Sequence, residues 1–179
     1  MSETSVTTGM VRFSYLNVWE PKQVNGEGDP KYSVSLIIPK SDTITKKKID
    51  KIIKELVEAV KVKNNGKLPA RFKLPLRDGD EERPDDEVYK DAWFLNANSK
   101  NKPGVVDKNV APILDQSEVY SGAYGRASVN FYSFDVSGNK GIACGLSHIQ
   151  KLKDGESLGG KMSIAEAFAD DFEDDDDLM

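Results

Sequence analysis

Apolar and polar residues alternate in two segments near the N-terminus. In the first segment Val11, Phe13 and Tyr15 fall on one face of the chain. The second segment, residues 32–38, repeats the same period of two, which is that of a strand with one face in a core. Between them, residues 21–31 read PKQVNGEGDPK, a composition typical of turns. The pattern therefore predicts a β-hairpin whose first strand is half buried.

The period changes after Pro39, where the hairpin ends. The apolar residues of the next segment recur at the spacing of a single helix face: Ile49, Ile52, Ile53, Leu56 and Val60. Ser41 or Asp42 can cap the N-terminus of this helix, and the sequence NNG at 64–66 is a typical C-terminal stop. We therefore expect one α-helix over about residues 43–63, with lysines on its solvent face.

The rest of the chain is predicted mainly as strands and loops. Residues 1–8 are polar and are expected to be loose, and residues 67–90 are expected to form a long irregular loop. Strands are predicted at 91–99, at 119–136 and, after a tight turn around Gly138, at 142–152. Five or six strands in hairpins with one inserted helix predict a mainly β protein, folded as a small antiparallel barrel.

The charges are distributed unevenly along the chain. Residues 1–161 hold all 25 Lys and Arg residues and 22 of the 30 acids, a net charge of +3. Residues 162–179 hold the other eight acids and no basic residue. Because a run of like charges cannot pack into a core, this division predicts a folded domain over 1–161 and a flexible acidic tail over 162–179. A mildly basic body with an acidic tail indicates a nucleic-acid partner.

The tail imitates the charge pattern of a phosphate backbone. We expect it to occupy the protein's own DNA groove until DNA displaces it, and then to dock on a basic patch of another protein. Phe172 would be the apolar anchor of that docking. The predicted partner-binding residues are Asp170, Asp171, Phe172, Glu173, Asp174, Asp175, Asp176 and Asp177.

Motifs that carry catalysis are absent from the sequence. The sole histidine, His148, lies in a predicted strand, and neither GxSxG nor a Walker A loop is present. The sole cysteine, Cys144, cannot form an intramolecular disulfide and offers no metal-ligand spacing. No leader and no apolar run of membrane-spanning length is found. We therefore expect a non-enzymatic protein of the cytoplasm, with no cofactor and no metal.

Single-strand binding needs cations that follow the phosphates and flat aromatic faces that accept bases. Alternation along 119–136 places Val129 and Phe131 on a core face and leaves Tyr132 and Phe134 as candidate stacking platforms, although each aromatic could instead be a core or cross-strand residue. The predicted nucleic-acid-binding residues are Arg12, Trp19, Lys31, Tyr32, Arg71, Lys73, Trp93, Lys100, Lys102, Tyr124, Arg126, Tyr132 and Phe134.

Three segments carry a resemblance to a known family: GMVRFSYLNVWEP at 9–21, KYSVSLIIPK at 31–40, and SGAYGRASVNFYSFDVSGNKGIACGLSHIQKLKDGESLGG at 121–160. The chain resembles the single-stranded DNA-binding proteins of tailed bacteriophages, in a family formerly described as a domain of unknown function. The resemblance implies an oligonucleotide/oligosaccharide-binding (OB) fold, a five-stranded barrel with one helix and long loops.

The same resemblance implies a function. It is sequence-independent binding of single-stranded DNA during phage replication, recombination and repair, in the host cell cytoplasm. The acidic tail would contact replication proteins such as a DNA polymerase or helicase, and a homodimer is a common state in such proteins. Related tails end on an aromatic residue, whereas seven residues follow Phe172 here.

Two other kinds of binding protein fit the sequence. One is a protein-interaction or DNA-mimic module that acts through its acidic tail, which the modest body charge of +3 favours. The other is an RNA-binding OB protein, because stacking faces do not distinguish ribose from deoxyribose. A nuclease is disfavoured, since no metal-binding carboxylate cluster lies within the predicted strands.

Overall fold

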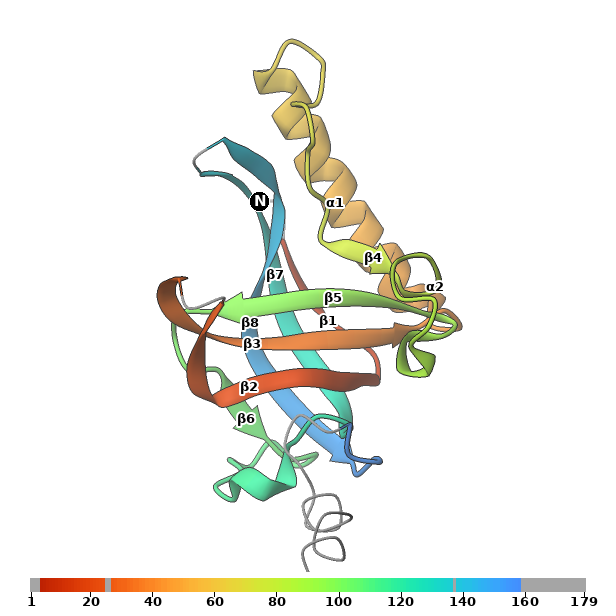
Figure 1. Cartoon of the computed structure of the whole chain (residues 1–179), viewed down its shortest axis with the longest axis vertical. Coiled ribbons are helices and arrows are strands. Elements are labelled where there is room, and N and C mark those ends of the chain that lie inside the picture. The colour runs from red at the N-terminus through yellow and green to blue at the C-terminus, as the bar shows by residue number, and fades with distance from the viewer. Residues whose placement is uncertain (1–3, 25–26, 137, 159–179) are drawn as a thin grey trace, which may run out of the picture.

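The long strands of the sheet close into a barrel (Figure 1). The computed structural model describes residues 4–24, 27–136 and 138–158. The barrel strands are β2 (Val11–Val24), β3 (Glu27–Pro39), β5 (Ala92–Ser99), β7 (Tyr124–Val136) and β8 (Asn139–Lys153). Four of the five pairings are antiparallel, and a parallel pairing of β5 with β8 closes the ring. Numbered along the chain, the strand order is 1-2-3-5-4-1, which confirms the predicted OB-type barrel.

The barrel interior is filled from alternate positions of its strands. Phe13, Leu36 and Leu95 are fully buried, and Val129 and Phe131 join them from β7. The prediction that β7 turns Val129 and Phe131 inward is therefore confirmed. The same alternation leaves the next residue, Tyr132, 42% exposed on the outer surface.

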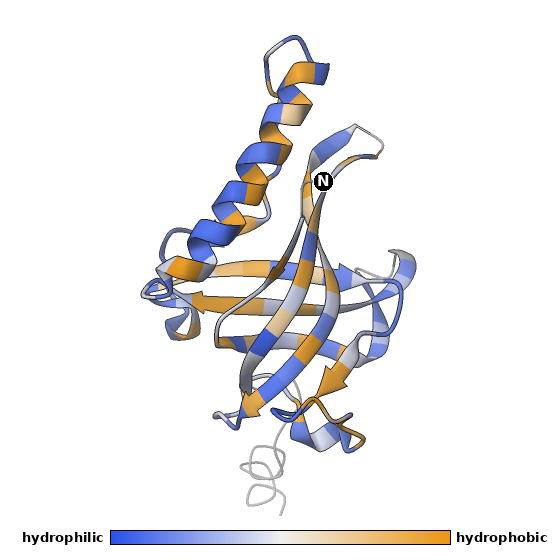
Figure 2. Ribbon diagram, turned by 180° about the vertical axis from the view of Figure 1, so that it is seen from behind, coloured by the Kyte–Doolittle hydropathy of each residue, from blue (hydrophilic) through white to orange (hydrophobic). Residues whose placement is uncertain are grey.

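The helix α1 (Thr43–Lys63) has the predicted bounds. The Asp42 carboxylate caps it by accepting a hydrogen bond from the Thr45 N–H at 3.1 Å, and the Gly66 N–H closes its last turn on the Lys61 carbonyl. Ile49 and Ile52 are buried against the barrel. Hydrophilic and hydrophobic bands alternate along the helix in Figure 2, as expected of a helix with one buried side.

Several short elements were not predicted, because three or four residues are too few to show a period. Residues 1–8 were expected to be loose, but β1 (Ser5–Thr7) pairs with β7 and buries Val6. The 119–136 segment becomes a strand only at Tyr124. The remaining unpredicted elements are β4 (Leu76–Asp78), α2 (Gly79–Glu82), η1 (Glu87–Tyr89), β6 (Gly104–Val106) and η2 (Gln116–Glu118).

Residues 67–90 were expected to be irregular, but the segment 76–91 is fastened to the barrel. The Lys40 ammonium lies 2.9 Å from the Asp78 carboxylate and 2.8 Å from that of Asp80, and these hydrogen bonds hold the pKa of both carboxyl groups below their usual value. The buried Tyr89 hydroxyl hydrogen-bonds with the hydroxyls of Ser14 at 3.2 Å and Ser35 at 3.3 Å. These contacts fix the segment against one face of the sheet.

The predicted acidic tail lies outside the described residues. Within residues 4–24, 27–136 and 138–158, no helix is long and apolar enough to cross a membrane. The same part of the chain holds no group of three His, Cys, Asp or Glu side chains that could hold a metal ion.

Burial makes the Cys144 thiol chemically inert in the folded protein. The residue is 2% exposed in the barrel wall, and burial raises its pKa far above that of a free thiol. We expect no reaction with Ellman's reagent in the native state and one equivalent of reaction after unfolding in urea. A fast native reaction would show that this strand does not face the core.

Candidate nucleic-acid interface

A groove lined by both polar and apolar residues crosses the outer face of β2, β3 and β5, the face toward the viewer in Figure 1. Alternation turns Ser33 and Ser35 of β3 outward, and they pair in register with Asn98 and Asn96 of β5. We call this surface the sheet groove. Its lining residues are Tyr15, Lys22, Lys31, Ser33, Val34, Ser35, Arg83, Asn96, Ala97 and Asn98.

Two lysines lie directly opposite each other in the sheet groove. Lys22 of β2 and Lys31 of β3 are cross-strand partners. Neither forms an ion pair with any carboxylate among the side chains that the structure describes. Like charges placed directly opposite destabilise a sheet. An anionic ligand in the groove would neutralise this pair, so the arrangement suits a phosphate backbone.

An exposed aromatic ring lies beside a third cation. The Tyr15 side chain is 58% exposed, and its backbone takes φ +47°, a conformation that costs free energy for a non-glycine residue and is concentrated at functional sites. The Arg83 guanidinium lies 5.5 Å from the Tyr15 ring centre, 4.6 Å from that of Tyr89 and 4.9 Å from that of Phe94. A flat ring and a cation together are what a stacked nucleotide requires.

The alternation pattern predicted the wrong side for Tyr15. The pattern places it on the face of Val11 and Phe13, which are buried, but the positive φ at Tyr15 shifts the register of β2. Beyond that point Leu16 and Val18 pack on the core, and the Tyr15 ring projects from the surface. An irregularity of this kind leaves no periodic signal in the sequence.

Of the predicted nucleic-acid-binding residues, only Lys31 lines the sheet groove. Tyr32, its neighbour on β3, is half buried, and Lys100 and Lys102 are exposed in the turn after β5. Arg71 and Lys73 lie in the exposed segment that follows α1. The contact of these four and of Tyr32 with nucleic acid stays a prediction.

Arg12 and Trp19 each donate hydrogen bonds to backbone carbonyls outside the barrel strands. The Arg12 guanidinium donates to the carbonyls of Gly122 and Glu156. It also lies 5.3 Å from the Tyr124 ring centre. The Trp19 indole N–H donates to the Val119 carbonyl at 3.1 Å. These contacts give each side chain a structural role.

Two further predicted residues are placed away from the sheet groove. Trp93 is half buried beneath the Lys46 ammonium, which lies 5.1 Å from its ring centre. Arg126 donates to the Thr8 carbonyl and lines a separate small pocket with His148. The structure therefore does not bring the predicted set together at one surface.

Sequence reasoning left Tyr15, Lys22, Arg83, Asn96 and Asn98 out of the predicted site. The two asparagines could have been found, because they alternate with Leu95 and Ala97 in a predicted strand. Arg83 could not, since its position depends on the long-range contacts of segment 76–91.

The fold and the groove define a class of protein: an OB barrel with cations and an exposed aromatic ring on the face that such barrels use for oligonucleotides. A sequence model of the family described as "Enterobacter phage Enc34, ssDNA-binding protein" matches residues 4–179. The chain belongs to this family, and the resemblance inferred from the sequence is confirmed. Membership also supports the prediction of a non-enzymatic protein.

Similar proteins agree with this assignment. The single-stranded DNA-binding protein from bacteriophage Enc34, solved in complex with ssDNA, matches with a TM-score of 0.77 and 26% identity over 87% of this chain and 90% of that one. Putative protein p50 of Acyrthosiphon pisum secondary endosymbiont phage 1 is 35% identical over 170 residues, 89% of this chain and 90% of its own. Gp2.5, a single-stranded DNA-binding protein encoded by bacteriophage T7, shares the fold with a TM-score of 0.64 and 15% identity, over 91% of this chain and 99% of that one.

Proposed function

We propose that this protein binds single-stranded DNA in the sheet groove, without sequence preference. The observation that carries the proposal is the facing pair Lys22 and Lys31, unneutralised among the described side chains and set in the same groove as the exposed Tyr15 ring. Cations follow any phosphate backbone, and an aromatic face stacks on any base, so such a groove is tolerant of sequence. Family membership and the Enc34 protein solved with ssDNA support the same ligand.

We also propose a biological setting. Single-stranded DNA is exposed during the replication, recombination and repair of phage DNA in the host cytoplasm, and we propose that the protein covers it there. The acidic tail, residues 162–179, would compete with DNA for the groove and recruit replication proteins such as a polymerase or helicase. We also propose that the protein self-associates as a homodimer.

Ligand preference and the tail can be tested together by fluorescence anisotropy. The probes are a labelled oligo-dT, a matched oligo-rU and a matched duplex, titrated with the full chain and with a 1–169 truncation at two salt concentrations. We expect preference for oligo-dT over the duplex, a steep loss of affinity with salt, and about two- to ten-fold tighter binding after truncation, because a competing polyanion has been removed.

Three other outcomes would change the role of the tail or the ligand. Unchanged affinity after truncation would reject the tail as a competitor of DNA. Equal or tighter binding of oligo-rU would favour an RNA ligand. If neither the full chain nor the 1–169 truncation bound any nucleic acid, the result would favour a protein-interaction or DNA-mimic module that acts through its acidic tail.

A further inference from the structure

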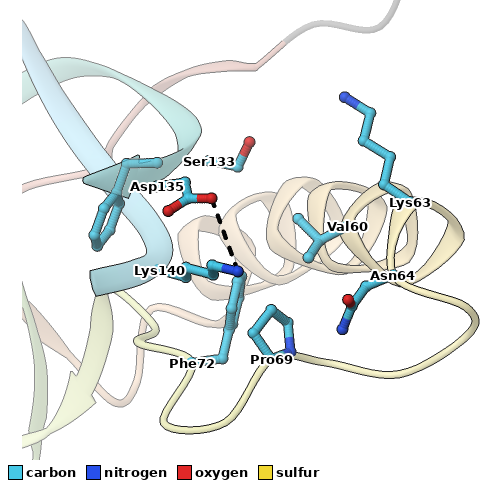
Figure 3. Close-up of a pocket in the computed structure, with 9 residues that line it drawn as sticks. Val60, Lys63, Asn64, Pro69, Phe72, Ser133, Asp135 and Lys140 are labelled. Carbon is cyan, nitrogen blue, oxygen red and sulfur yellow. Dashed lines mark ion pairs between the residues drawn. The ribbon is translucent and has the colours of Figure 1, made fainter. Parts of the chain in front are cut away.

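A second cleft lies between α1 and the β7–β8 hairpin (Figure 3). Its apolar lining residues are Val60 of α1, Pro69 and Phe72 of the following loop and Phe134 of β7, and Asn64, Ser133 and Asp135 add polar groups. Lys63 lies at its margin, and Lys140 reaches into it, with its ammonium 3.8 Å from the carboxylate of Asp135 (Figure 3). We call it the helix–hairpin cleft. None of its lining residues belongs to the sheet groove.

Backbone hydrogen bonds fix the loop that forms one side of the cleft. The Lys73 N–H donates to the Lys140 carbonyl at 3.0 Å, and the Ile142 N–H donates to the Lys73 carbonyl at 2.9 Å, so the loop after α1 is tied to the start of β8. This close approach requires a glycine at Gly141, where a Cβ would lie 2.5 Å from the Lys73 carbonyl oxygen. The cleft is therefore a preformed feature of the fold.

Positive charge is concentrated around this cleft. Residues 57–75, the end of α1 and the loop after it, hold five Lys or Arg residues and one acid, a net charge of +4, whereas residues 1–161 together carry +3. Lys63, Lys67 and Arg71 form no ion pair with any side chain that the structure describes. Apolar side chains beside these unpaired cations suit a polyanion that also carries flat apolar groups.

The position of the cleft relates it to the sheet groove. Figures 1 and 2 both show α1 and the β7–β8 hairpin extending beyond the same side of the barrel, and in Figure 1 this is the side on which β5 lies. β5 also carries Asn96 and Asn98 of the sheet groove. A DNA strand that leaves the groove across β5 would therefore meet the helix–hairpin cleft.

We propose that the helix–hairpin cleft is a second contact surface for the same DNA strand. Phe134 and Phe72 would accept an unstacked base, and Lys63 and Lys140 would hold the flanking phosphates. This inference rests on the proposed function. The sequence predicts that Arg71, Lys73 and Phe134 contact DNA, but they lie outside the sheet groove. A second contact surface at the cleft would account for that prediction.

The chain's own acidic tail fits the cleft less well. The described chain ends at Leu158, whose N–H donates to the Ser121 carbonyl. Figure 1 places that end of β8 at the opposite end of the strand from the hairpin tip. The 15 residues of β8 measure roughly 50 Å along the strand. Phe172 lies 14 residues beyond Leu158 and could follow that path only if the tail were almost fully extended.

The test compares oligonucleotide lengths, using the 1–169 truncation so that the tail cannot interfere. A short oligo-dT of about 6 nucleotides can fill one surface only, and one of about 20 can reach both, because a single OB fold covers roughly 4–16 nucleotides. We expect K63A/K140A to weaken binding of the long oligonucleotide about ten-fold and to leave the short one within about two-fold. K22A/K31A, in the sheet groove, should weaken both.

Two further variants separate the contact from general charge and from folding. K47A/K48A removes the same charge from exposed positions at the start of α1 and should change neither affinity by more than about two-fold. F134L keeps apolar volume but removes the ring, and should weaken only the long oligonucleotide while its melting temperature confirms folding.

The outcomes are distinguishable. Equal effects of K63A/K140A and K47A/K48A, or no effect of the cleft variants on the long oligonucleotide, would overturn the inference. An effect of K63A/K140A in the full chain but not in the truncation would assign the cleft to an acidic tail instead. No effect of K22A/K31A on either length would contradict the proposed function, whatever the cleft variants do.

Discussion

Replacing Lys22 and Lys31 together by alanine is expected to lower the affinity for single-stranded DNA by about one to two orders of magnitude at low salt. Each lysine that contacts a phosphate contributes about 0.7 to the slope of log affinity against log salt, so the slope should become shallower by about 1.4. Folding stability should not fall, because the two ammonium groups face each other across β2 and β3 and repel in the free protein.

The combination of these effects makes the result specific. A lysine pair with a purely structural role would lose stability and affinity together. The K47A/K48A variant, which removes two exposed lysines from α1, is the matched control for charge. Titrations of both variants with oligo-dT at several salt concentrations, with urea denaturation beside them, decide the question. An unchanged slope in K22A/K31A would show that these lysines do not contact phosphates.

The second large effect is expected on stability. Phe131 is 1% exposed inside the barrel, and its replacement by alanine should cost about 3–5 kcal/mol of unfolding free energy, since it removes buried apolar surface and leaves a cavity. Tyr132, the next residue, is 42% exposed, and Y132A should change stability by no more than about 0.5 kcal/mol.

Urea denaturation of the two variants measures this contrast directly. The pair is matched in position and in the type of change, so the difference reports which face of β7 enters the core. Equal losses of stability would mean that Tyr132 is also packed, and a larger loss in Y132A would reverse the assignment of the two faces.

The elements that could be predicted from the sequence are those held by a repeating local pattern. α1 shows a full apolar face between Asp42, which caps it, and the NNG stop at 64–66, so its bounds agree with the structure. Residues 32–36 of β3 alternate between apolar and polar. The barrel was predicted from the hairpins and the family resemblance.

The elements that escaped prediction depend on contacts between distant residues. Segment 76–91 has no period of its own, and its position is set by Lys40 with Asp78 and Asp80 and by Tyr89 with the hydroxyls of Ser14 and Ser35.

The sheet groove escaped prediction for the same reason. Lys22, Lys31 and Arg83 come from separate segments, and only strand pairing and the fastened segment 76–91 bring them to one face. The residues singled out from the sequence were aromatic side chains next to cations along the chain. Several of these, Trp19 and Tyr124 among them, form such pairs inside the structure of the protein itself.

Chemical-shift mapping tests the location of DNA on the sheet groove most directly. Amide spectra of the isotopically labelled 1–169 truncation would be recorded during titration with a short oligo-dT. We predict the largest shifts at Tyr15, Ser33, Asn96 and Asn98, with the face around Arg126 and His148 unaffected. Shifts centred on Arg126 and His148, with the β3 and β5 amides unchanged, would contradict DNA binding in the sheet groove.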